Sequence, residues 1–306
     1  MSHKNFVIVI ATTFAALILT ASQALAIVVV GGQPDPTHNG NAMRLWLRGD
    51  SGIDNPGGLV GTWSDKSTHG NNAVSDDDVI KPTHSTTGFG GRQVLNFIDN
   101  GERMRLPAAL NSVFAGDFTM FTLVAPNDGD PNRDELWFGL IDPAASTPNR
   151  TFQGTDGNSS PQTLNTMYKA DGSNGNAIID PSPIADGPSS AHTLFSYVNV
   201  AGGTNSVFVD GNSTAAATGG GVTNSNFTGI TSGPCVGAAC KDGSAWPNSG
   251  NTFKGEFAEI IIYDGALSDS DREAVEDYML SYVPEPSSLV LLVLGICGLL
   301  VHRRRR

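Results

Sequence analysis

The sequence predicts an all-β domain, a sandwich of two antiparallel sheets followed by one short helix. Only 16% of the 306 residues are charged, and 36 glycines and 17 prolines interrupt the chain. Short runs rich in β-branched and aromatic residues recur, each bounded by Gly, Pro, Asn or Asp, as is typical of strands. The body contains no repeat of about 20–50 residues and no internal linker, which favours one sandwich over a propeller, a solenoid or two domains.

The expected strands share this composition and are 43–47, 59–63, 93–98, 118–124, 135–141, 164–169, 192–200, 207–210 and 255–263. After 207–210, Asp210-Gly211 suits a tight hairpin turn with positive φ. One helix is expected after the last strand, where Ser268 and Asp271 form a capping-box pattern. Its apolar face, Ala274, Val275, Tyr278 and Met279, is expected to dock on the edge of the sandwich.

Residues 1–26 have the pattern of a secretory signal peptide. Lys4 gives a positive start, residues 6–19 are almost entirely apolar, and Ala24 and Ala26 supply the small side chains that signal peptidase requires. We therefore expect export, with cleavage after Ala26 and a linker over 27–40. The alternative is an uncleaved anchor helix.

The other end carries a second targeting pattern. Pro284-Glu285-Pro286 precedes an apolar run, 289–301, and the basic residues Arg303, Arg304, Arg305 and Arg306 follow it. As a helix the run spans about 20 Å, short for a hydrocarbon core of about 30 Å. The arginines would stay on the cytoplasmic side. A plain tail anchor is the alternative, but it does not explain the Pro-Glu-Pro.

This order of elements resembles the PEP-CTERM sorting signal over residues 283–306. The resemblance implies recognition by an exosortase, a membrane-embedded cysteine peptidase. It further implies transient anchoring in the inner membrane through a short transmembrane helix. The protein would then be displayed at the cell surface or in an extracellular matrix.

Cysteine usage agrees with export. Cys235 and Cys240 are five positions apart in a Gly-rich loop and would form a small disulfide in an oxidising compartment. Cys297 lies inside the apolar run, as an apolar filler or a lipidation site. No His/Cys pair follows at the spacing of a zinc site.

Charge limits the partners. The formal net charge is −12, so a nucleic-acid partner is disfavoured. Acidic residues cluster at 76–78 and at 127–135, where Asp128, Asp130 and Asp134 are weak candidates for Ca²⁺ binding. The second cluster lacks the 12-residue spacing of a helix-loop-helix site, and both clusters also fit solvated acidic loops.

A second resemblance brackets residues 43–282. Its opening motifs are Leu-Trp-Leu-Arg-Gly-Asp at 45–50, Trp-Ser-Asp-Lys-Ser at 63–67 and Gly-Asn-Asn-Ala at 70–73. Phe-Val-Asp-Gly at 208–211 and the closing segment 253–268 complete it. These motifs resemble LamG-like, concanavalin A-like lectin/glucanase domains. The resemblance implies a jelly roll over 41–282, with possible Ca²⁺ near a sugar site. Trp137 and Trp246 would stack on sugars if exposed, although Trp137 lies in an expected strand.

The sequence offers weak catalytic candidates. The Glu-x-Asp-x-x-Glu motif of glucanases on this fold is absent. Glu256 and Glu259 are three positions apart, which places them on opposite faces of a regular strand. Glu259 is expected on the face of Phe257, Ile261 and Tyr263. There it would be a half-buried structural carboxylate, paired with an arginine such as Arg44 or Arg48 or with backbone amides. The sharper alternative is a perturbed catalytic acid.

Other catalytic signatures are missing from the sequence: there is no nucleophile elbow, zinc-protease motif or phosphate loop. The four histidines in the body are scattered: His38, His69, His84 and His192. We therefore expect a non-catalytic module that binds extracellular polysaccharide or matrix. The alternatives are a divergent polysaccharide hydrolase or lyase on the same fold, and a purely architectural coat component.

Overall fold

The computed structural model describes residues 29–30, 33–36, 42–75, 81–88, 91–98, 101–126, 136–141, 150–156, 163–169, 177–183, 192–220, 231–241, 244–245 and 252–281. The expected signal peptide and sorting tail, with their hydrophobic terminal helices, lie outside these residues. Within the described part of the chain, no helix is long and apolar enough to cross a membrane.

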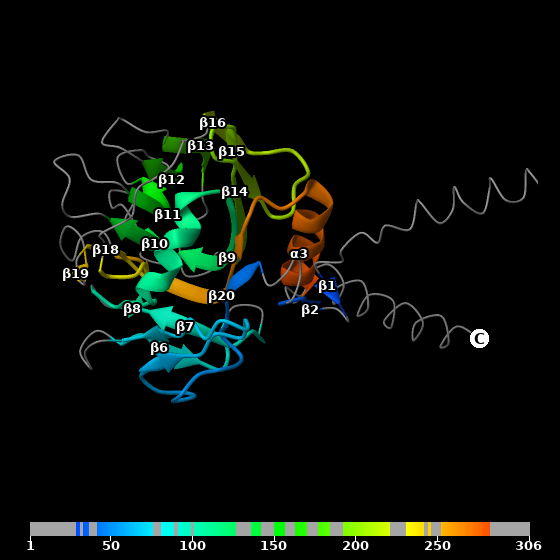
Figure 1. Ribbon diagram of the computed structural model, residues 1–306. Helices are drawn as coiled ribbons and strands as arrows, with labels where there is room; N and C mark the ends of the chain where they lie inside the picture. Colours follow the sequence, from blue (N-terminus) through cyan, green and yellow to red (C-terminus); the bar gives the residue numbers. More distant parts are fainter. Residues whose placement is uncertain are drawn as a thin grey trace, which may run out of the picture.

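Two large sheets form the body (Figure 1). The eight-stranded sheet has the order β16 (Ala217–Gly220), β15 (Thr204–Val209), β14 (Thr193–Asn199), β9 (Phe118–Pro126), β20 (Gly255–Asp264), β7 (Val94–Phe97) and β6 (Thr83–Ser85). Strand β3 (Met43–Arg48) also pairs with β20. The long strands β9 and β20 form its centre, because they are the most continuously apolar segments of the chain.

The ten-stranded sheet lies opposite. Its order is β13 (Ala177–Pro183), β12 (Thr163–Lys169), β11 (Arg150–Asp156), β10 (Leu136–Ile141), β17 (Cys235–Val236), β8 (Met104–Arg105), β5 (Ala73–Val74) and β4 (Thr62–Trp63). Strand β18 (Ala239–Lys241) pairs with β10 and with β19 (Ser244–Ala245). The described pairings in both sheets are antiparallel except that of β10 with β18. The expected architecture of two antiparallel sheets is therefore confirmed.

An aromatic core fills the space between the sheets. Phe257 of β20 packs edge-on against Trp63 of β4, with ring centroids 5.9 Å apart, and also contacts Phe97 and Phe253. A helical turn of 3₁₀ type, η3 (Ala108–Ala115), adds Phe114 to this core. Each such ring buries a large apolar area, so the core alone stabilises the sandwich.

The expected turn with positive φ is present, since Asp210 and Gly211 have φ of 51° and 73°. It does not close a tight hairpin, because residues 210–216 separate β15 from the antiparallel strand β16. The segment 59–63 differs from expectation, because only Thr62–Trp63 of it is strand. Leu59 is 49% exposed there and makes only an isolated bridge to Thr83.

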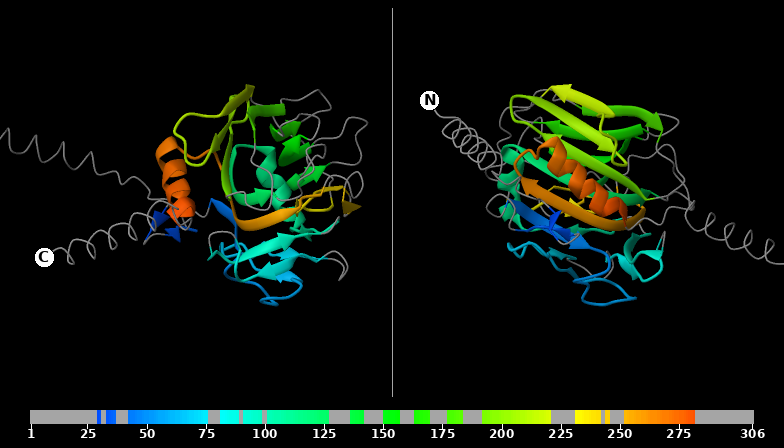
Figure 2. Two further views of the ribbon diagram at one scale, coloured as in Figure 1. Left: turned by 180° about the vertical axis from the view of Figure 1, so that it is seen from behind. Right: turned by 90° about the vertical axis from the view of Figure 1, so that its right-hand side faces the viewer.

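The helix α3 (Asp269–Ser281) lies on the outer face of the eight-stranded sheet (Figure 2). The capping box forms as expected, since the Asp271 amide donates to Ser268 Oγ at 3.2 Å and Ser268 Oγ donates to the Asp271 carboxylate at 2.8 Å. The expected docking on the sandwich edge is wrong. Val275, Tyr278 and Met279 instead join a second core over the central strands, with these sheet residues: Met43, Trp46, Val94, Phe121, Leu123, Leu194, Ala258, Ile261 and Tyr263.

A small ribbon lies beside this helix. Strands β1 (Val29–Val30) and β2 (Gln33–Pro34) pair antiparallel and contact α3 (Figures 1 and 2). The segment 27–40, expected as a linker, therefore contains two short paired strands. As a result, residues from the two ends of the domain meet on one face.

Candidate functional site

A β-bulge in β20 sets the geometry of the site. Phe257 pairs with Val124 of β9, but the next matched pair is Glu259 with Leu123, so Ala258 is the extra residue. Phe257 faces the core between the sheets, whereas Ala258 faces α3. The bulge turns the Glu259 side chain to the α3 face as well, since it contacts Trp46 and Tyr278 there.

The bulge corrects two expectations about the carboxylates. Glu259 shares its face with Ile261 and Tyr263, as expected, but not with Phe257. Glu256, next to the inward-facing Phe257, also lies on the α3 side. The two glutamates are therefore on the same face, and the argument from regular strand alternation is wrong because it assumed no bulge.

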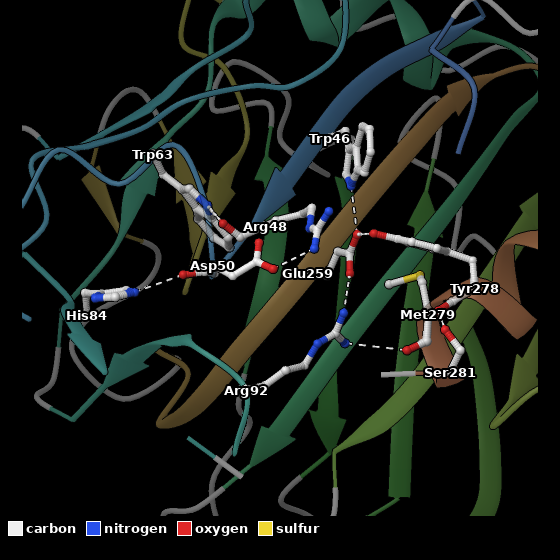
Figure 3. A network of polar contacts seen from close by, with 11 residues as sticks. Trp46, Arg48, Asp50, Trp63, His84, Arg92, Glu259, Tyr278, Met279 and Ser281 are labelled. Atoms are coloured by element: carbon white, nitrogen blue, oxygen red, sulfur yellow. Dashed lines mark hydrogen bonds and ion pairs between the residues drawn. The ribbon is translucent and has the colours of Figure 1, made fainter. Parts of the chain in front are cut away.

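Glu259 is the centre of a buried polar network (Figure 3). Its carboxylate is fully buried. Oε1 accepts hydrogen bonds from the Trp46 indole at 2.7 Å and from the Tyr278 hydroxyl at 3.0 Å. Oε2 lies 2.9 Å from Nη2 of Arg92. Side chains from β3, from the segment before β7 and from α3 thus meet at one carboxylate of β20.

Glu259 pairs with an arginine, as expected, but the ion pair is made with Arg92 rather than with one of the two arginines named as examples. Arg44 pairs with Asp264 at the surface, 2.6 Å apart, and Arg48 pairs with Asp50 at 2.5 Å. The partner is Arg92, which precedes the expected strand 93–98 and carries no spacing signal in the sequence. Glu259 was expected to be half-buried. It is fully buried instead, because α3 packs over it.

Burial and the neighbouring charges have opposite effects on the pKa of Glu259. Burial raises the pKa of Glu259, and this effect exceeds the opposing influence of Arg92, the Trp46 hydrogen bond, the Arg48 charge and the Tyr278 hydrogen bond. The guanidinium of Arg48 stays nearby, 5.8 Å from the Trp46 ring centroid. Arg92 and Arg48 therefore offset part, but not all, of the cost of burying the charged form of Glu259.

The network holds the last turn of α3. Nη1 of Arg92 donates to the Met279 carbonyl at 3.5 Å, and Ser281 Oγ donates to the Tyr278 carbonyl at 2.7 Å. The carbonyls of a final helical turn have no partners within the helix, and a cation beside them is favourable. Arg92 therefore neutralises Glu259 and caps the helix with the same guanidinium.

A second buried contact holds the first half of α3. Arg272 and Glu276 are fully buried and pair at 2.5 Å, one helical turn apart. The guanidinium carbon of Arg272 lies 3.7 Å from the ring centroid of Phe208, on β15. Burial raises the pKa of Glu276. The pair with Glu276 lies within the helix, so it is the contact of Arg272 with Phe208 that holds this part of α3 on the sheet.

The histidines do not converge on this site. The His192 imidazole lies 3.4 Å from the Glu256 carboxylate, but burial and the Arg92 charge lower its pKa to about 4, so the ring is neutral at pH 7. His84 accepts from the Gly57 amide at 2.9 Å and lies 2.9 Å from the Gly49 carbonyl. His69 is exposed, and His38 lies outside the described residues.

The remaining candidates are distributed over the molecule. Cys235 and Cys240 are joined by a disulfide that links β17 to β18 in the ten-stranded sheet. Trp137 is fully buried and stacks on Phe195, with ring centroids 5.2 Å apart, so it is a core residue that cannot reach a sugar.

Several expected site residues lie outside the part of the chain that the structure describes. They are Ala24, Ala26, residues 76–78, Asp128, Asp130, Asp134, Trp246, Pro284, Glu285, Pro286, Cys297 and Arg303 to Arg306. Among the described residues, no group of three or more His, Cys, Asp or Glu side chains is arranged to hold a metal ion.

The arrangement around Glu259 performs a structural task. Three donors from Trp46, Tyr278 and Arg92 occupy the carboxylate, and the side chain has no contact with solvent. A general acid or nucleophile must lie within hydrogen-bond reach of a substrate. The buried carboxylate of Glu259 is out of reach of a substrate in this arrangement.

Comparisons with known proteins agree with parts of this account. Residues 283–306 match the family model of the PEP-CTERM protein-sorting motif. No curated protein matches the chain in sequence.

Solved structures share the fold at low sequence identity. The binding domain of Paraclostridial Mosquitocidal Protein 1 matches with a TM-score of 0.54 and 12% identity, covering 80% of this chain and 55% of that one. A Trypanosoma rangeli sialidase in complex with a difluorinated sugar acid matches with a TM-score of 0.52 and 15% identity, covering 86% of this chain. The match spans only 37% of the sialidase chain. These likenesses establish a shared β-sandwich fold.

Removing the central carboxylate should destabilise the protein strongly. We expect Glu259→Leu to lower the free energy of unfolding by about 3–5 kcal/mol, because the Arg92 charge is left without its partner. Asp264→Ala, on the same strand, breaks the exposed pair with Arg44 and should cost less than about 1 kcal/mol. Urea denaturation measures both.

A double variant separates loss of the charge pair from loss of packing. Glu259→Leu combined with Arg92→Leu should recover part of the stability, since no unpaired charge remains buried. Equal losses for Glu259→Leu and Asp264→Ala would contradict the network.

Burial of His192 predicts a pH dependence. Its pKa is about 4 in the folded chain against 6.5 ordinarily, so the unfolded state binds a proton that the folded state excludes between these values. Above pH 6.5 the buried neutral ring costs no stability. As the pH is lowered from 6.5 to 4, the burial of His192 lowers the free energy of unfolding by about 3 kcal/mol. Glu259, Glu276 and Asp210 act in the opposite direction because their pKa values are raised.

The effect of His192 is therefore measured by comparing the pH dependence of stability between variants. Unfolding free energies at pH 7 and pH 4.5 should show a smaller acid loss for His192→Gln than for the unmodified chain. The exposed His69→Gln should behave as the unmodified chain does. An identical acid loss in His192→Gln would contradict the assignment.

Proposed function

We propose that this chain is an exported, exosortase-sorted protein that presents a non-catalytic, glycan- or matrix-binding sandwich at the cell surface. In this proposal signal peptidase removes residues 1–26, and residues 27–40 lead into a LamG-like jelly roll over 41–282. The tail 283–306 anchors the protein in the inner membrane until exosortase acts. The match of residues 283–306 to the sorting motif is the observation that carries the proposal.

The structure supports the division between domain and tail. The helix α3 ends at Ser281, and the sorting motif begins two residues later. Buried contacts of Arg92 with Met279, of Tyr278 with Glu259 and of Arg272 with Phe208 hold the helix on the sheet. The tail thus begins where the folded domain stops, as a removable sorting segment requires.

Glycan binding rests on the fold and on what the similar proteins handle. The matched sialidase is described in complex with sialic acid, and the mosquitocidal protein match is described as a binding domain. Fold alone does not determine function, so the ligand is assigned by analogy and by the surface location. The acidic composition argues against a nucleic-acid ligand.

A hydrolase on the same fold is the second candidate. The bulge in β20 favours it in one respect, because it places Glu256 and Glu259 on the same face. The burial of Glu259 and its three donors oppose it, since neither carboxylate oxygen can approach a glycosidic bond. We therefore assign Glu259 to the structure, and a screen for release of reducing ends from β-glucans tests the alternative.

The sorting motif predicts a change of location. Replacing Pro284, Glu285 and Pro286 together with alanine should leave the protein uncleaved in the inner-membrane fraction, because exosortase no longer recognises the tail. Alanine at Ser287 and Ser288 is the matched control and should leave surface display unchanged. Cell fractionation with mass determination of the intact protein provides the measurement. Unaltered surface display of the triple variant would overturn the sorting proposal.

The binding domain predicts retention on polysaccharide. Protein recovered from the cell surface should bind the host's extracellular polysaccharide in a pull-down, whereas the heat-denatured protein should not. Parallel assays with Ca²⁺ and with a chelator test the weak metal candidates Asp128, Asp130 and Asp134. Absence of retention under every condition would remove the glycan-binding part and leave an architectural coat protein.

A further inference from the structure

Both membrane-directed segments reach the sandwich on the same side. The helix α3 ends at Ser281, shortly before the sorting tail, and β1 begins at Val29, shortly after the signal segment. β1 and β2 contact α3, and all views place them together outside the eight-stranded sheet (Figures 1 and 2). The ten-stranded sheet lies on the far side of the domain from all three elements.

The helix cannot act as a flexible extension of the tail. Its last turn is held by Tyr278 on Glu259 and by Arg92 on the Met279 carbonyl. Its first half is held by the buried Arg272, whose guanidinium carbon lies 3.7 Å from the ring centroid of Phe208 on β15. The position of Ser281 on the domain is therefore fixed, and the distance that the tail can reach is counted from it.

The connecting segments are short compared with the domain. Seven residues, 282–288, separate Ser281 from the apolar run, and they extend to at most about 25 Å. Nine residues, 20–28, separate the N-terminal apolar stretch from β1 and extend to at most about 32 Å. A domain of about 240 residues has a radius of gyration of about 18 Å and is about 45 Å across. Neither connection can pass around it.

From these lengths we infer that α3, together with the β1–β2 ribbon, forms the membrane-facing side of the domain. The inference rests on the proposed sorting function, because it requires the tail to be in the bilayer. After removal of the signal peptide, the connection 282–288 alone still prevents the ten-stranded sheet from reaching the membrane. The surface offered to extracellular ligands is therefore the side of the ten-stranded sheet.

The charge of α3 suits this position. Asp269 and Asp277 are exposed, Asp271 and Glu273 are partly exposed, and the only basic residue of the helix, Arg272, is buried. Anionic headgroups repel such a surface, so the domain stands off from the bilayer rather than lying on it.

Energy transfer to labelled lipid headgroups tests the orientation. The full chain, with Cys297→Ser, is reconstituted in phosphatidylcholine vesicles that carry an acceptor on their headgroups. Donors are placed through Asp277→Cys on α3 and, as the matched control, through Val74→Cys, whose side chain is exposed on β5 of the ten-stranded sheet. We expect transfer efficiency several-fold higher from position 277 than from position 74.

The outcomes separate this inference from the proposed function. If the chain floats with vesicles but transfer is equal at the two positions, or greater at position 74, the orientation is wrong and the sorting proposal stands. If the chain does not float with vesicles, the tail does not insert, and both the orientation and the anchoring step are overturned.

Discussion

The buried carboxylate of Glu259 is the constraint on which the arrangement of this protein depends. Removing an ion from water costs several kcal/mol, and the cost is offset only by well-placed partners. Here the partners come from three other segments: Trp46 from β3, Arg92 from the approach to β7, and Tyr278 from α3. Any displacement of one of these segments would leave the charge partly unpaired, so the network defines a single position for each.

This constraint connects the fold to the sorting segment. An apolar helix face can slide on an apolar sheet at little cost, because the hydrophobic effect is not directional. The hydrogen bonds to Glu259 and the contact of Arg92 with the Met279 carbonyl are directional, and they fix the end of the helix. The end of the helix, Ser281, is thereby fixed three residues before Pro284. The last turn of α3 therefore connects the sandwich to the sorting tail.

The sequence could predict those features that arise from local patterns. The long β-branched segments around Phe121 and Ile261, the Ser268 capping box and the Asp210-Gly211 turn each carry their information within a few residues. The tail was recognisable for the same reason. Strands β13, with two prolines, and β16, with two glycines, were missed because these residues are typical of loops.

The geometry of the site depends on features that no local sequence pattern indicates. A bulge at Ala258 reversed the face of Glu259, and only the register with β9 reveals it. Arg92 pairs with a carboxylate 167 positions away, so its role could not be read from spacing. The sequence nevertheless contained one indication. A glutamate within the apolar part of a strand needs a hydrogen-bonding or charged partner when it is buried. Arg92, shortly before another expected strand, was available as such a partner.

Hydrogen exchange of the α3 amides tests the central claim most directly. If the buried network fixes the helix to the sheet, the amides of Tyr278 and Met279 should exchange only through global unfolding, with the same protection as those of β20. Exchange of the α3 amides orders of magnitude faster than that of β20 would show that the helix detaches from the folded sandwich, and would contradict the account.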